Sequence, residues 1–226
     1  MKSEQEIKKA AKTIISFTDS YTKNKQGKQN EQQESDSMPS LTEISSTLEY
    51  LRNQIQDDNT LKSVIRIPKL LQSFSALSLY KICCHLSEDI DQQRLEVRHI
   101  SRDCLSQIQV YGDIKDQTKI VRKGYGRVIC ISFCTAGGQG EEQDEEISDG
   151  LYNISWFLSE LRIGRNKTSK LLTLLVRRTL EQIEEEGANE EIDAQMNNNG
   201  YDGDIIDYAN DTKTETLNHF IHRRRR

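Results

Sequence analysis

The chain has 226 residues, 35% of them hydrophobic and 30% charged, with a formal net charge of −5. This length accommodates one domain of ordinary size together with polar tails. The acidic balance argues against nucleic-acid binding as the main function, since the one notable basic cluster is Arg223 to Arg226. The start, MKSEQEIKKAAK, lacks the apolar core of a signal peptide, and no apolar run reaches the ~20 residues of a membrane-spanning helix. We therefore expect an intracellular protein with at most peripheral membrane association.

The first forty residues contain one helix followed by a polar loop. Residues 1–23 are predicted to form an amphipathic helix because their apolar residues recur at helical spacing. These positions are Ile7, Ala10, Ala11, Ile14, Thr18 and Tyr21. Residues 24–40 are mostly Gln, Asn, Ser, Lys and Glu, a composition that predicts a disordered loop. The main domain is predicted over 41–210, and residues 211–226 are expected to be a polar and basic tail.

A second helix is predicted to begin after Ser40. This serine is a candidate N-cap, because Glu43 follows three residues later as in a capping box. The apolar residues then step by three and four positions: Leu41, Ile44, Leu48, Leu51 and Ile55. This spacing predicts a helix that ends near residues 57–59.

The stretch from Arg122 to Gly138, RKGYGRVICISFCTAGG, is expected to form the centre of the fold. Its run from Val128 to Ala136 contains no charge, so it must be covered on all sides. The β-branched residues in this run would also suit a buried strand. We favour a helix because of the residues that flank the run.

The C-terminal half continues with helical patterns. Residues 139–150 are acidic and contain glycine, which predicts a loop. Residues 151–163 hold the only Trp, Trp156, in an apolar patch, and 168–185 are a predicted helix. With further helical spacing over 97–108 and no hairpin signals, seven or eight helices are expected. The predicted fold is therefore an all-α globular bundle with one buried central helix.

The five cysteines indicate buried reduced thiols. They all lie in apolar segments and show no CxxC spacing or nearby His pair: Cys83, Cys84, Cys104, Cys130 and Cys134. We therefore expect neither a metal nor a cofactor. Since the sequence lacks a recognisable nucleophile–base pair, we also expect no catalysis. A thiol-dependent enzyme that uses Cys83 or Cys84 is a weaker alternative.

Three segments form motifs when they are read together. The first is Gly124-Tyr125-Gly126-Arg127 leading into VICISFCTAGG, and the second is NNGYDGDI from Asn198 to Ile205. The third consists of apolar residues on one predicted helical face, followed by a small residue and acids. Its members are Leu79, Cys83, Leu86, Ser87, Glu88, Asp89 and Ile90.

In order and spacing, these segments resemble the homology motifs of the Bcl-2 family of apoptosis regulators. The chain would be a divergent member, since Tyr125 and Tyr201 stand where relatives have Trp. Cys83 replaces the usual Leu, and Asp204 falls where relatives have an aromatic residue. An acidic insert lengthens the gap between motifs one and two, and we expect no hydrophobic tail anchor, because the apolar stretch 217–221 is far too short to be one. The resemblance covers about residues 75–210.

The resemblance implies that the protein binds amphipathic Bcl-2 homology-3 helices in a hydrophobic groove. The implied groove residues are Tyr125, Gly126, Arg127, Leu79, Cys83, Leu86 and Ile90. Arg127 would pair with the characteristic Asp of the partner helix, and Gly126 would let the partner backbone come close. The second motif contributes Gly200, Tyr201, Asp202 and Ile205.

The implied partners are pro-apoptotic homology-3 helices or other Bcl-2 family proteins, in the cytoplasm or at the mitochondrial outer membrane. More ordinary interpretations remain open for each part. Arg127 also fits a surface arginine at a helix start, and the apolar residues of motif three also fit a plain core. The whole chain also fits a helical viral or structural interaction protein, unrelated to apoptosis, whose glycines are helix caps.

Overall fold

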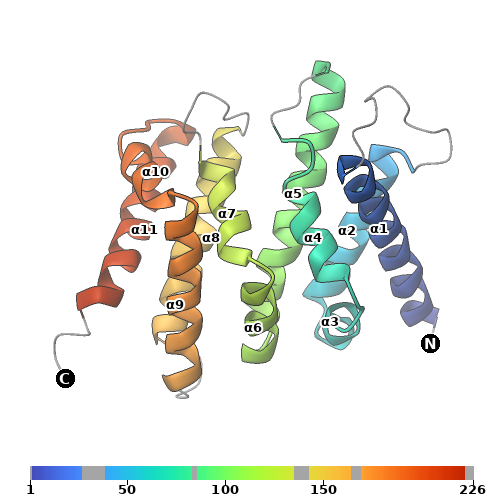
Figure 1. The fold of residues 1–226 in the computed structure, drawn as a ribbon, viewed down its shortest axis with the longest axis horizontal. Helices are drawn as coiled ribbons and strands as arrows, with labels where there is room; N and C mark the ends of the chain where they lie inside the picture. The colour runs from blue at the N-terminus through green and yellow to red at the C-terminus, as the bar shows by residue number, and fades with distance from the viewer. Residues whose placement is uncertain (1, 27–38, 83–85, 135–142, 164–168, 222–226) are drawn as a thin grey trace. The chain divides into compact units, whose positions relative to one another are not determined.

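The computed structural model describes residues 2–26, 39–82, 86–134, 143–163 and 169–221. These residues form eleven α-helices and one 3₁₀ helix, and no strand occurs among them (Figure 1). The all-α fold class predicted from helical spacing is therefore confirmed. More helices are present than expected because three short helices, α3 (Asp58–Ile65), α4 (Leu70–Leu77) and α10 (Ala188–Gln195), were not predicted. Each of them has eight residues. Within the described ranges, no helix is both long enough and apolar enough to cross a membrane.

Contacts divide the chain into two compact units, Met1–Gln117 and Thr118–Arg226. The boundary falls inside α6 (Ile114–Arg122). The domain predicted over 41–210 spans parts of both units, and its bounds stay a prediction. Each unit has more than a hundred residues, which is enough to enclose a core of its own.

The first unit is built on α1 (Lys2–Gln26), α2 (Leu41–Gln56), α3 (Asp58–Ile65), α4 (Leu70–Leu77) and α5 (Glu88–Tyr111). As predicted, Ser40 caps α2, since its hydroxyl accepts a hydrogen bond from the Glu43 amide at 3.1 Å. The apolar face of α2 packs against α5 and forms the core of this unit. The buried residues of these two helices include Ile44, Leu48, Leu51, Ile55, Val97, Ile100, Cys104 and Ile108.

The second unit is built round α7 (Tyr125–Phe133), which packs against α8 (Asp144–Ile163), α9 (Ser169–Glu185) and α10 (Ala188–Gln195). The uncharged run is therefore a helix, as favoured, and it ends at Phe133; residues 135 and 136 lie outside the described part. The acidic residues from 144 to 150 were expected in a loop but begin α8. Carboxylates are favourable in a first helical turn because of the helix dipole, and this explains the correction.

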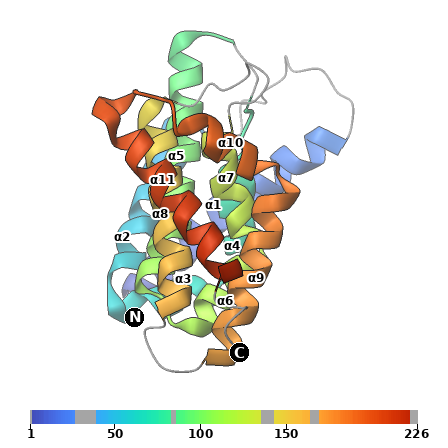
Figure 2. The ribbon, with the colours of Figure 1, turned by 90° about the vertical axis from the view of Figure 1, so that its left-hand side faces the viewer.

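The C-terminal part of this unit is a 3₁₀ turn, η1 (Tyr201–Gly203), followed by α11 (Asp204–Ile221). Helix α11 lies beside α8 (Figures 1 and 2). Residues 211–221 are thus helical rather than a tail, because their threonines can face the core. The Thr212 hydroxyl is buried and donates to the Leu151 carbonyl at 3.0 Å.

At the N-terminal end of the chain, α1 extends to Gln26, which is longer than predicted. Residues 27–38 of the predicted loop lie outside the described part.

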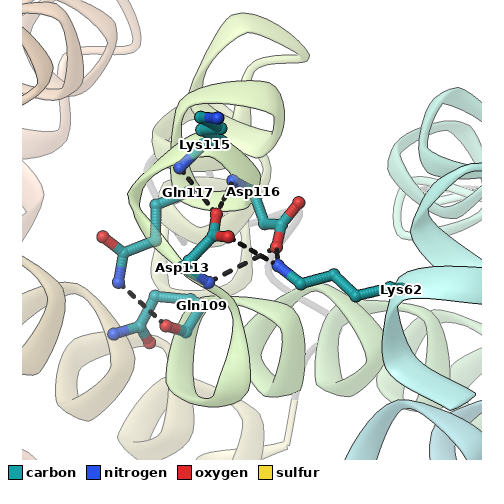
Figure 3. Close-up of polar contacts among 6 residues, drawn as sticks. All are labelled: Lys62, Gln109, Asp113, Lys115, Asp116 and Gln117. Carbon is teal, nitrogen blue, oxygen red and sulfur yellow. Dashed lines mark hydrogen bonds and ion pairs between the residues drawn. The ribbon is translucent and has the colours of Figure 1, made fainter. Parts of the chain in front are cut away.

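A polar cluster closes the turn between α5 and α6 (Figure 3). The Lys62 ammonium donates to the Asp113 carboxylate at 2.7 Å and also to the buried Asp116. Asp113 in turn accepts the backbone amides of Lys115 at 2.8 Å and of Asp116 at 3.1 Å. The Gln117 side chain donates to the Gln109 carbonyl at 3.0 Å. The cluster therefore ties α3 to the start of α6 and caps that start.

This cluster predicts acid sensitivity of the first unit. The Lys62 hydrogen bond lowers the pKa of Asp113 to about 2, although burial acts in the opposite direction. The pKa of Asp113 is lower in the folded state than the unfolded value of about 3.9. The carboxylate therefore stabilises the folded unit at pH values above about 3.9, and this contribution is lost as the pH falls towards 2. The Asp113 side chain is 56% exposed, so the contribution should stay below about 1 kcal/mol.

The measurement compares wild type with Asp113→Asn by urea unfolding at pH 5, 3 and 2. The stability advantage of wild type should shrink as the pH falls. An advantage that is the same at all three pH values would contradict the assignment.

Candidate helix-binding site

The first motif forms the N-terminus of α7, and its aromatic residue is part of the core. Gly124 caps the helix with a φ of 86°, a left-handed conformation that suits glycine. Tyr125 is fully buried, and its ring meets Phe157 of α8 edge to face, with centroids 5.2 Å apart. Tyr125 was expected to line a groove; the structure places it inside the second unit.

Gly126 allows α9 to approach α7 closely. A Cβ at this position would lie 3.0 Å from Gln182 Oε1 and 3.2 Å from Thr179 Cγ2. The Gly126 amide donates to Gln182 Oε1 at 3.1 Å, and Gln182 Nε2 donates to the Val121 carbonyl at 2.8 Å. The glutamine side chain therefore satisfies an otherwise unpaired amide in the first turn of α7.

Arg127 extends outward from the same turn of α7. Its side chain is 60% exposed, and its Nε lies 2.9 Å from Glu186 Oε1, directly after the last residue of α9. Thr179, Gln182 and Glu186 thus meet α7 at positions i, i+3 and i+7. This is the spacing by which an amphipathic helix is received in a groove. The chain's own α9 lies where the sequence analysis placed a partner helix.

The third motif does not form one helix, and this prediction is wrong. Helix α4 ends at Leu77 and α5 begins at Glu88, so Leu79 and Ile90 do not share a helical face. Leu79 is half-buried, whereas Leu86 is 65% exposed and Ile90 is 36% exposed. Cys83 lies outside the described residues. All of this motif belongs to the first unit, and motifs one and two belong to the second.

Two arginines of α5 explain why helix α4 ends at Leu77. Arg102 Nε donates to the Ser78 carbonyl at 3.4 Å, and Arg98 Nη1 donates to the Tyr80 carbonyl at 3.3 Å. These carbonyls follow the end of α4 and are satisfied by side chains rather than by a further helical turn. Ser87 then caps α5 by accepting the Ile90 amide at 3.4 Å.

The sequence did contain a signal for this start of α5. A serine followed by acids is typical of a helix N-terminus, and Ser87, Glu88 and Asp89 show that pattern. The same three residues also fit the acidic end of motif three, so their pattern alone was ambiguous.

The second motif forms the entry to α11. Gly200 precedes η1, and a side chain in its place would clash with the Asp144 carboxylate of α8. Asp202 and Gly203 have φ values of 54° and 95°, and Ile205 is fully buried in the first turn of α11. The Tyr201 side chain lies outside the described part. These residues form a tight turn and a core contact, and their role in partner binding stays a prediction.

The described thiols are unsuited to nucleophilic chemistry. Cys104 and Cys130 are fully buried, as expected, and burial raises the pKa of both well above the usual value. Burial, with Glu191 and Glu186 nearby, raises the pKa of the half-buried Cys134 to about 12. Cys83 and Cys84 lie outside the described residues. In the described ranges, no group of three or more His, Cys, Asp or Glu residues is placed to hold a metal ion.

We predict that Cys104 and Cys130 resist alkylation in the native protein. A thiol reacts as the thiolate, and both burial and a raised pKa keep the thiolate population very small. Iodoacetamide treatment at pH 8, followed by peptide mapping, should show modification of these two cysteines only after denaturant is added. Rapid native labelling of either would contradict the described core.

Comparison with models of known protein families found no match, and no curated protein or solved structure matches the chain significantly.

Proposed function

We propose that this protein is a non-enzymatic regulator that binds amphipathic helices of partner proteins at the start of α7. The observation that carries the proposal is the contact between this site and α9. Gly126 provides the space for a helix backbone, and Arg127 provides a cation for an acid on the same helix face. A partner helix with a small residue and an acid at similar spacing would make the same contacts.

Such a partner would have to replace α9 in its contacts with Gly126 and Arg127. The Arg127–Glu186 ion pair is largely exposed on the arginine side, so it is worth at most about 1 kcal/mol. The tether to α9 still makes the competition intramolecular, which lowers the apparent affinity of any partner. The free protein would therefore bind partners weakly until α9 is loosened.

The resemblance to the Bcl-2 family makes the proposal more specific. The partners would be Bcl-2 homology-3 helices, whose characteristic Asp would take the place of Glu186 beside Arg127. The protein would then regulate apoptosis in the cytoplasm or at the mitochondrial outer membrane. Motif one at the start of a helix that continues as an uncharged run supports this, whereas the interruption of motif three limits the resemblance to the second unit.

Fluorescence polarisation with a labelled homology-3 peptide tests the proposal through the two partners of one ion pair. Glu186→Gln should raise peptide affinity up to about fivefold, because it leaves Arg127 available. Arg127→Glu should lower affinity about tenfold or more, because like charges then face each other. A purely structural ion pair would change peptide binding similarly in both variants.

The control peptide carries Ala in place of its Asp. It should bind wild type and Arg127→Glu about equally, because it lacks the aspartate that would pair with Arg127. The proposal fails if wild type and Glu186→Gln both leave the labelled peptide unbound.

One observation favours a second candidate, a helical interaction protein unrelated to apoptosis. Gly124, Gly187 and Gly203 all adopt positive φ beside a helix start, as glycines in turns and caps do. In that case a homology-3 peptide would not bind, whereas other helices with an acid and a small residue would.

A further inference from the structure

We propose that α8 and α11 form a second docking surface, which binds a basic amphipathic helix of a partner protein. The surface consists of Tyr152, Trp156, Tyr208, Asp204 and Asp211, and we refer to it as the aromatic–acidic face. It uses none of the residues at the start of α7, so it is independent of the function proposed above.

Three aromatic rings form a continuous platform on this face. The Tyr152 ring lies edge to face with Trp156, with centroids 5.7 Å apart, and with Tyr208 of α11 at 5.3 Å. Tyr152 is 39% exposed and Trp156 is 36% exposed, although most large apolar side chains of α8 are buried. Exposed aromatic residues on a rigid pair of helices are typical of protein-binding surfaces.

The two helices hold this platform rigidly. The Thr212 hydroxyl donates to the Leu151 carbonyl at 3.0 Å, directly beside the Tyr152–Tyr208 contact. Further along, Arg162 makes two parallel hydrogen bonds to Glu215, of 2.9 Å and 2.8 Å. The platform is thus fixed before a partner arrives, which reduces the entropic cost of binding.

The charge around the platform selects the partner. Asp204 and Asp211 lie four residues before and three residues after Tyr208, so they share its side of α11 and are exposed. In the part of the chain that the structure describes, neither aspartate makes an ion pair. Helices α8 and α11 contain nine acidic residues and two basic ones, Arg162 and Lys213, and both basic residues pair with carboxylates.

This charge excludes two other occupants and favours a cation. A second copy of the chain would bring the same acidic face against itself, and an anionic lipid surface would be repelled in the same way. Arginine side chains can stack on Tyr and Trp rings and can pair with the flanking carboxylates. A helix with an apolar stripe flanked by Arg or Lys therefore complements both features.

Trp156 is the only tryptophan of the chain and reports binding directly. The probe is a synthetic helical peptide of about five turns, with a Leu stripe flanked by Arg. Titration into the full-length protein should shift the Trp156 emission, and raising the salt to about 0.3 M should weaken binding. A peptide with the same Leu stripe and Glu in place of Arg should leave the emission unchanged.

Paired charge reversals make the test specific. Asp204→Lys with Asp211→Lys should weaken binding about tenfold or more, because attraction becomes repulsion. The matched control, Glu184→Lys with Glu185→Lys at exposed positions in the last turn of α9, makes the same charge change and should alter affinity less than twofold. Arg127→Glu should also leave affinity unchanged. The proposal is overturned if the Arg peptide fails to bind, if the Glu peptide binds equally well, or if both pairs of reversals weaken binding alike.

Discussion

Replacing Tyr125 by Ala should lower the free energy of unfolding of the second unit by about 3–5 kcal/mol, as is usual for a buried aromatic residue. Tyr125 is fully buried, and its ring meets Phe157 edge to face at 5.2 Å. The substitution removes this contact and leaves a cavity between α7 and α8. Urea unfolding followed by the emission of Trp156, which lies in α8, measures the loss in this unit directly.

Tyr125→Phe is the matched control, because it keeps the ring and its contact with Phe157. Its cost should be about 1 kcal/mol, as is usual for the loss of one hydroxyl group. If Tyr125→Ala costs no more than Tyr125→Phe, the ring is not part of the core.

Replacing Leu48 by Ala should destabilise the first unit by about 2–5 kcal/mol. Leu48 is fully buried on the face of α2 that packs against α5. The first unit contains no tryptophan, so hydrogen exchange of peptides from α2 and α5 provides the measurement. Both helices should exchange faster in the variant.

Leu86→Ala is the matched control, and it also tests the corrected third motif. Leu86 is 65% exposed, so the same change there should cost less than about 0.5 kcal/mol. A loss comparable to that of Leu48→Ala would place Leu86 in a core.

Amphipathic spacing was sufficient to predict the helices whose cores are regular. The steps from Ile44 to Ile55 correspond to one buried face of α2, and the capping signal at Ser40 located its start. The uncharged run after Arg127 was predicted to be buried, because charge-free helices must be covered on all sides.

The site could be predicted only in part, because its geometry depends on contacts between distant segments. Motif one located the start of α7, but the identity of the helix against Gly126 depends on Gln182 and Glu186, some sixty residues later. Helical spacing alone also joined Leu79 to Ile90. The arginines that satisfy the carbonyls after the end of α4 come from α5, and no local pattern reveals such a long-range contact.

The most direct test of the central claim is hydrogen exchange of α9 during peptide binding. If a partner helix takes the place of α9 beside Gly126 and Arg127, a bound homology-3 peptide should speed exchange in Ser169–Glu185. Exchange in α11 should stay unchanged. If the peptide binds and the amides of α9 stay as protected as in the free protein, the partner helix does not replace α9 at this site.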